Sequence, residues 1–194
     1  MQEEYFIRSN NRYKTEAQGN IYEGYIVKEF QYDFMRMKLF QGSMSIMLPI
    51  VFQDMDENIK RLKYPCEQRP QIIKTSDDGK INFTFSYVDV KVTINMLSQI
   101  RGQLKHVVKS MQPSTMFFDE GDERKPGTNI SWFDYKSFTV EEPLYNLAVI
   151  ACINEKYLYG LFNCPFLEMN LWKPAMIQVA QSIIDESVCE EDKK

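Results

Sequence analysis

The only histidine of the chain, His106, is the first residue to consider for catalysis, because imidazole is the side chain that most often moves protons near neutral pH. It lies in a run whose apolar residues recur at helical spacing, from Leu97 through Leu104 to Met111. At about 100° per residue, His106 falls roughly 150° from the centre of that apolar stripe. We therefore expect His106 to face solvent, and we expect no Ser-His-Asp or Cys-His catalytic arrangement.

Two groups of acidic residues are candidates for metal binding. Asp54, Asp56 and Asn58 have the spacing that opens a calcium-binding EF-hand loop, but Ile59 and Pro65 replace the glycine and glutamate which that loop requires. A helix start explains the same residues better. The acidic run at 119–123 could ligate a hard cation through its carboxylates, although a solvated loop is favoured because Arg124 and Lys125 follow it. We expect no metal ion and no cofactor.

The cysteines and the charge of the chain restrict its location and partners. Cys66, Cys152, Cys164 and Cys189 are too widely spaced for a zinc site, and we expect reduced thiols. The net charge of −4, without a Lys/Arg stripe, argues against nucleic acid. Acidic residues at the start and the lack of an 18-residue apolar run favour the cytoplasm over export or a membrane. We expect another protein as the partner, and a monomer or a homodimer.

The chain also contains 11 methionines and 13 phenylalanines, which could form an adaptable apolar surface because thioether side chains repack easily around varied partners. Core packing is the more common use of such residues. In the run 81–87, alternate polar residues would face away from the apolar ones, so one side of that strand is predicted to contact water. The candidate interaction surface therefore comprises Met35, Met37, Met44, Met47, Asn82, Thr84 and Ser86.

In the first half of the chain, the pattern predicts mainly strands around one short helix. A long strand is expected over 25–40, and Gln41-Gly42 turns it back into a second strand over 43–48. Asp54 is predicted to cap a short helix that carries Met55, Ile59 and Leu62 and ends at Pro65. A further hairpin joins 71–74 to 80–87 around Asp77-Asp78-Gly79.

The second half of the chain contains two predicted amphipathic helices, over 93–111 and 171–187. Between them lie predicted strands over 115–118, 130–140, 144–153 and 157–164, with the acidic loop 119–126 after the first. The last two strands are predicted to form a hairpin across Asn154-Glu155-Lys156. We expect one domain over 1–194, with residues 1–20 partly mobile and 188–194 forming a solvated tail. The predicted fold class is α+β, similar to an α/β/α sandwich: a predominantly antiparallel sheet packed by a central and a C-terminal amphipathic helix.

This order of elements resembles small bacterial proteins of the Mog/PsbP-like fold, including the DcrB-like group. The resemblance is carried by Ser45-Ile46-Met47-Leu48-Pro49 at a strand end, and by a final strand pair leading into a helix that ends near Ser182-Ile183. It covers roughly residues 32–184 and its motifs are structural. It implies an antiparallel sheet with helices on both faces. The group includes a binder of a small GTPase, a photosystem extrinsic subunit and chaperones of secreted effectors, and it has no common catalytic residues, so no site carries over.

Three functional hypotheses follow. The favoured one is a non-enzymatic protein-interaction module, adaptor-like or chaperone-like, because no catalytic constellation is visible. The alternative is a small-ligand binder or a hydrolase whose residues gather in a pocket that sequence spacing does not reveal. A third is a secreted protein, which would require protected cysteines. The composition of the largest concave surface is the observation that best separates these hypotheses.

Overall fold

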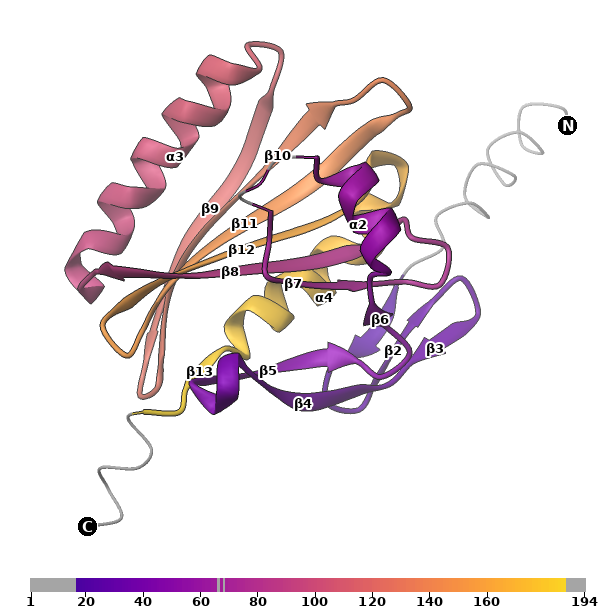
Figure 1. The fold of residues 1–194 in the computed structure, drawn as a ribbon. Helices are drawn as coiled ribbons and strands as arrows, with labels where there is room; N and C mark the ends of the chain where they lie inside the picture. The colour runs from indigo at the N-terminus through magenta and orange to yellow at the C-terminus, as the bar shows by residue number, and fades with distance from the viewer. Residues whose placement is uncertain (1–16, 66, 68, 188–194) are drawn as a thin grey trace, which may run out of the picture.

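The computed structural model describes residues 17–65, 67 and 69–187 (Figure 1). Its main element is a seven-stranded sheet in the order β6-β7-β8-β12-β11-β10-β9, in which every neighbouring pair is antiparallel. The strands are β6 (Gln53–Asp54), β7 (Ile72–Thr75), β8 (Asn82–Lys91), β9 (Met116–Lys125), β10 (Thr128–Phe138), β11 (Pro143–Ile153) and β12 (Lys156–Pro165).

Two small three-stranded sheets lie beside the large one. The first is formed by β1 (Gln18–Asn20), β2 (Gly24–Val27) and β3 (Phe30–Tyr32). The second is formed by β4 (Phe34–Leu39), β5 (Met44–Pro49) and β13 (Ile184–Asp185), so the segment after the last helix returns to pair with β5. Residues 1–16 and 188–194, for which we expected mobility and a solvated tail, lie outside the described residues, whereas Gln18–Asn20 form β1.

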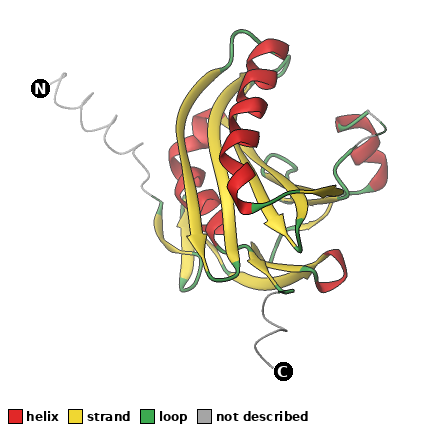
Figure 2. Ribbon diagram, turned by 90° about the vertical axis from the view of Figure 1, so that its left-hand side faces the viewer, coloured by secondary structure: helices red, strands yellow, loops and turns green. Residues whose placement is uncertain are grey.

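Helices cover both faces of the large sheet. The α3 helix (Leu97–Met111) lies on one face, and α4 (Met169–Gln181) lies on the other, between the sheet and β5; Figure 2 shows α3 in front of the strands. A short helix, α2 (Glu57–Lys63), precedes β7, and three 3-10 turns complete the fold: η1 (Phe40–Gly42), η2 (Ile94–Met96) and η3 (Phe166–Glu168). The predicted α+β class, with an antiparallel sheet packed by two amphipathic helices, is confirmed.

Alternate residues of β11 belong to two apolar clusters, one on each face of the sheet. Leu147 and Val149 belong to the cluster that contains α4, whereas Ala148 and Ile150 pack with Leu97 of α3. Because both faces of this central strand are buried, its sequence from Leu147 to Ile153 is continuously apolar instead of alternating. On the helices, Val179 is fully buried and Leu104 is partly buried against the α3-side cluster, as the amphipathic patterns predict.

The first predicted strand is wrong in one respect: residues 25–40 form three strands. Lys28 and Glu29 adopt left-handed backbone conformations, with φ of 49° and 72°, and turn β2 into β3. The sequence does not reveal this turn because left-handed turn positions are usually occupied by glycine, asparagine or aspartate. The turn between β11 and β12 uses Asn154 and Glu155 in the same conformation, and that hairpin was predicted correctly.

Three further expectations are corrected by the structure. The acidic run 119–126 is predominantly part of β9 and is not a loop. The α2 helix is capped by Asp56, whose carboxylate accepts the backbone N–H groups of Asn58 and Ile59, and Leu62 in that helix is exposed. The C-terminal helix ends at Gln181 and not at residue 187, because β13 follows it.

Replacing either of two glycines with alanine is expected to change the stability of the protein, with opposite signs. A Cβ atom on Gly121 would lie 2.8 Å from three atoms of the Trp132 indole, whereas a Cβ atom on Gly102 in α3 would meet nothing within 4 Å. We expect Gly121→Ala to lower the free energy of unfolding by about 1–3 kcal/mol through overpacking. We expect Gly102→Ala to raise it by about 0.5–1 kcal/mol, because alanine loses less backbone entropy in a helix. Urea denaturation of the two variants measures both effects, and equal signs would contradict this prediction.

Candidate functional site

Of the four methionines in the predicted interaction surface, two are at least partly exposed and two are buried. Met35 on β4 is 45% exposed, and Met37 on the same strand is partly exposed. Met44 and Met47 on β5 are buried in the α4-side core, so their inclusion in an exposed surface is wrong. The strand β5 lies between β4 and β13 with α4 packed on it, and all six of its residues are therefore buried.

The polar part of that surface is also largely buried. Asn82 and Thr84 on β8 are 5% and 3% exposed, and only Ser86 remains partly accessible. The Asn82 amide donates to Asn163 Oδ1 across the strand pair at 3.1 Å, and the Thr84 hydroxyl donates to the Leu161 carbonyl at 3.0 Å. These hydrogen bonds compensate for the loss of water. The prediction that this side of β8 contacts water is therefore wrong for Asn82 and Thr84, at the start of the strand.

A concave site of about 490 Å³ lies in the described part of the chain, and none of the predicted site residues lines it. It lies where the β2–β3 turn, the β5–β6 loop, the β7–β8 turn and the start of α4 meet. We call it the Trp172 pocket and define it by its aromatic and acidic lining residues: Tyr32, Phe52, Trp172, Asp77, Asp78 and Glu168.

The aromatic side of the Trp172 pocket is rigid because its rings contact one another. The ring centroids of Tyr32 and Trp172 are 4.9 Å apart in an edge-to-face arrangement, and Phe52 lies 6.1 Å from Trp172. Phe30, which is 52% exposed, packs against Tyr32 with a centroid distance of 4.6 Å. Aromatic pairs in these geometries prefer fixed orientations. The pocket therefore offers a preformed apolar wall with exposed aromatic surface at its mouth.

The acidic side of the pocket comprises Asp77, Asp78 and Glu168. Burial alone would raise the pKa of Asp78, but hydrogen bonds from the Ser76 hydroxyl and from the Lys80 backbone N–H outweigh burial and lower it. Lys28 Nζ lies 2.5 Å from Glu168 Oε1, so the one lysine in the lining is already paired. Burial, followed by the charges of Asp78 and Glu168, raises the pKa of Tyr32 and keeps its phenol neutral.

Local turn chemistry places these groups. Gly79, with φ of 69°, closes the β7–β8 turn, and its N–H donates to the Ser76 carbonyl at 2.8 Å. The sequence predicts this turn from Asp77-Asp78-Gly79, and it predicts the C-terminal amphipathic helix that carries Trp172. The sequence does not predict that the turn and Trp172 line one pocket, because the lining residues are spread from Val27 to Trp172 and only the tertiary fold brings them together.

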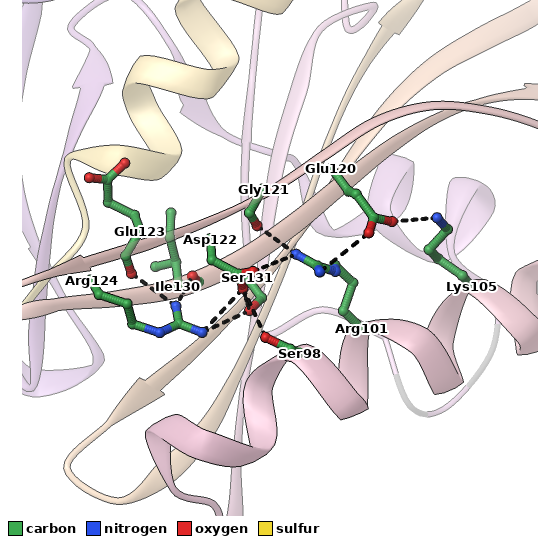
Figure 3. Close-up of polar contacts among 10 residues, drawn as sticks. All are labelled: Ser98, Arg101, Lys105, Glu120, Gly121, Asp122, Glu123, Arg124, Ile130 and Ser131. Atoms are coloured by element: carbon green, nitrogen blue, oxygen red, sulfur yellow. Dashed lines mark hydrogen bonds and ion pairs between the residues drawn. The ribbon is translucent and has the colours of Figure 1, made fainter.

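A second polar cluster connects α3 to the edge strand β9 (Figure 3). Arg101 of α3 reaches Asp122 at 3.1 Å and Glu120 at 3.3 Å, and it donates to the Gly121 carbonyl at 2.9 Å. Lys105 also contacts Glu120, and Arg124 contacts Asp122 at 3.1 Å. The helix is thereby fixed to the strand by charge-assisted hydrogen bonds as well as by apolar packing.

These pairings bear on the predicted acidic run. Each of its four carboxylates lies within 4 Å of a lysine or arginine nitrogen: Asp119, Glu120, Asp122 and Glu123. Within the ranges 17–65, 67 and 69–187, no group of three or more His, Cys, Asp or Glu side chains is placed to hold a metal ion. His106 is exposed on α3, as its helical position predicts. The carboxylates of the acidic run thus form ion pairs within the fold.

The α3–β9 cluster makes folding stability sensitive to acid. The hydrogen bond from Lys105 holds the pKa of Glu120 below its ordinary value of 4.5; burial would raise the pKa of Asp122, but the Ser131 hydrogen bond and Arg101 lower it below 3.8. Their stabilisation is present above those ordinary values and is lost as pH falls through the lowered ones. We expect Arg101→Met to cost about 1–2 kcal/mol at pH 7 and to weaken this acid dependence.

Urea midpoints of the parent protein and Arg101→Met between pH 7 and pH 3 would measure this effect. The matched control is Lys105→Met, which removes one partner of Glu120 and is expected to cost about 0.5 kcal/mol. Parallel pH curves for the parent and Arg101→Met would contradict the assignment.

A third cluster lies on the α4 side of the sheet and is centred on one fully buried carboxylate. Asp134 is 0% exposed, and its carboxylate accepts the Asp119 backbone N–H at 2.6 Å and the Tyr145 hydroxyl at 2.9 Å. Lys173 of α4 lies 2.6 Å from Asp134 and 2.5 Å from the exposed carboxylate of Asp119. Burial would lower the pKa of Lys173, but these hydrogen bonds raise it, so the amine stays charged.

The arrangement described above is that of the Mog/PsbP-like fold: an antiparallel sheet between helices, with the last helix after the final hairpin. The solution structure of cyanobacterial PsbP (CyanoP) from Synechocystis sp. PCC 6803 matches with a TM-score of 0.57 and 10% identity, over 81% of this chain and 95% of that chain. The predicted resemblance is thus confirmed at the level of the fold.

Two further solved structures are similar to this chain at lower scores. The Ran-binding protein Mog1p of Saccharomyces cerevisiae has a TM-score of 0.48 at 10% identity, over 81% of this chain and 98% of that one. LpqN, involved in cell envelope biogenesis of Mycobacterium tuberculosis, has a TM-score of 0.46 at 10% identity, over 81% and 93%. No protein-family model and no curated protein matches the sequence. At these identities the likeness concerns the fold alone.

Proposed function

We propose that this protein is a non-enzymatic interaction module, adaptor-like or chaperone-like, that binds a partner protein at the Trp172 pocket. The observation that carries the proposal is the composition of the pocket mouth. Phe30 and Val51 line the pocket and are 52% and 47% exposed, and Ile50 beside them is 52% exposed. Exposed apolar side chains around a concave site are typical of surfaces that become covered by another macromolecule.

A small-ligand binder is the second candidate, and the size of the pocket favours it. A volume of about 490 Å³ lies within the range of small-molecule sites, roughly 300–1,000 Å³. A small ligand would fill the interior beside Trp172, but it would leave Phe30 and Ile50 in water. A protein segment covers the interior and the mouth together, so we favour a protein partner.

A photo-crosslinking experiment tests the proposal by position. Benzoyl-phenylalanine replaces Val51 at the pocket mouth, Met35 on the predicted β4 surface, or Gln103 on the exposed side of α3, and each protein is irradiated in producing cells. We expect a discrete protein adduct from the Val51 position only. An adduct from the Met35 position alone would move the interface to β4, equal adducts from all three would indicate non-specific contact, and no adduct would favour a small ligand.

A cytoplasmic location is part of the same proposal. The described cysteines, Cys152 and Cys164, are free thiols, and burial raises the pKa of both, which makes them unreactive. None of the described helices is long and apolar enough to cross a membrane. We expect protein purified without reductant and unfolded in denaturant to contain four titratable thiols per chain. A count of two or fewer would indicate a disulfide and an oxidising compartment.

A further inference from the structure

The charges that line the Trp172 pocket are unbalanced. Glu168 is neutralised by Lys28, whereas neither Asp77 nor Asp78 forms an ion pair with any of the described lysine or arginine side chains. The Asp78 carboxylate is held in place by hydrogen bonds from the Ser76 hydroxyl and from the Lys80 backbone N–H, and the charge of the Lys80 side chain acts on it without forming an ion pair. The β7–β8 turn therefore contributes two acidic residues to the cavity lining, neither of which is ion-paired to a described lysine or arginine.

The cavity also has an aromatic lining. Phe30, Tyr32, Phe52 and Trp172 all line it, and the other three rings pack against Tyr32. The faces of aromatic rings attract cations, and a ring next to a carboxylate attracts them more strongly because both contributions have the same sign. A neutral or anionic group would gain neither contribution in this position.

We propose that the Trp172 pocket receives an arginine side chain from a segment of the partner protein, with apolar residues of that segment covering Phe30 and Val51. The inference deepens the proposed function and rests on it. A planar guanidinium can stack on an aromatic face while its N–H groups donate to carboxylates, here those of Asp77 and Asp78. Its long stem fills the apolar part of a cavity of about 490 Å³, which a compact inorganic cation would leave empty.

The test uses two acetylated, amidated tetrapeptides and the full-length ¹⁵N-labelled protein. The first peptide alternates leucine and arginine, and the second replaces arginine with citrulline, which has the same shape without the charge. We expect the arginine peptide to shift the indole N–H signal of Trp172 and the backbone amide signals of Asp77 and Asp78. The citrulline peptide should bind about tenfold more weakly, which corresponds to one ion pair with stacking. Raising the salt concentration should weaken only the arginine peptide.

Matched variants assign the effect to the two carboxylates. The double variant Asp77→Asn/Asp78→Asn should lose about tenfold in affinity for the arginine peptide and little for the citrulline peptide. The control is Asp89→Asn, an exposed carboxylate on β8 that pairs with Lys156 and does not line the pocket. It should leave both affinities unchanged. A dispersed amide spectrum of each variant shows that the variant has folded.

Other outcomes separate this inference from the proposed function. Equal binding of both peptides at the same amides would overturn the arginine assignment and leave the interaction pocket standing. Free arginine amide binding as tightly as the peptide would overturn the protein source in favour of a small cationic ligand. Shifts that grow with protein concentration alone would point to a second copy as the occupant. No shift with either peptide would overturn the arginine assignment, and a lack of crosslinks from Val51 would then overturn the proposed function too.

Discussion

Replacing Asp134 with alanine should lower the free energy of unfolding by about 3–5 kcal/mol, the largest effect of any single charge in the fold. The carboxylate is fully buried, and its removal leaves the Lys173 amine, the Tyr145 hydroxyl and the Asp119 N–H without their shared acceptor. Breaking a buried pair costs more than the pair contributes, because the remaining charge stays in a poorly solvated environment.

The chain supplies a matched control for Asp134 in the second carboxylate on the same lysine. Asp119 lies 2.5 Å from Lys173, but its side chain is 67% exposed. Because water replaces an exposed partner readily, Asp119→Ala should cost no more than about 1 kcal/mol. Urea denaturation of the two variants, with unchanged m-values, measures the difference. A cost for Asp134→Ala no greater than that for Asp119→Ala would show that burial does not govern this cluster.

The second large effect is expected at Trp172, which is 1% exposed and contacts Tyr25, Tyr32 and Phe52. Trp172→Ala should cost about 3–5 kcal/mol, because the indole connects α4 to the β1–β2–β3 sheet and to the β5–β6 loop, and its removal leaves a cavity that the packed rings cannot fill. Trp172→Phe keeps an aromatic ring and should cost about 1–2 kcal/mol.

Phe30→Ala is the surface control for Trp172, since Phe30 lines the same pocket but is 52% exposed. It should cost less than about 1 kcal/mol. Thermal and urea unfolding of the three variants give the ranking. Similar costs for Trp172→Ala and Phe30→Ala would indicate that the pocket wall is already loose in the parent protein, and the pocket would then not be preformed.

The core of this fold is predictable from the sequence because it depends on local periodicity. The stripe of α3, the hairpin around Gly79 and the Asn154–Glu155 turn were all predicted from residues adjacent in the chain. The expected loop at 119–126 failed for a physical reason: charged residues usually indicate solvent, yet an edge strand tolerates them when a neighbouring helix supplies counter-charges. The turn at Lys28 and Glu29 was not predicted, because neither residue is of a type that usually occupies left-handed turn positions.

The candidate site was much less predictable than the fold. Met44 and Met47 appeared suitable for a surface by type, but the pairing of β5 with both β4 and β13 buries them. Asn82 is polar by type, but its cross-strand partner Asn163 is 81 residues away. The Trp172 pocket likewise depends on contacts between residues that are far apart in the sequence. Such contacts are decided by the packing of elements, which the spacing of residues along one element does not encode.

The contacts between α3 and β9 also affect how the β9 edge of the large sheet behaves in a crowded solution. An edge strand ten residues long, with backbone groups unpaired on one side, would ordinarily recruit strands from other chains. Here Arg101 occupies the Gly121 carbonyl, and Glu120 and Asp122 are bound to helix side chains. An incoming chain that paired with the middle of β9 would have to dehydrate and separate these charges, so this part of the edge resists fibril growth and domain exchange.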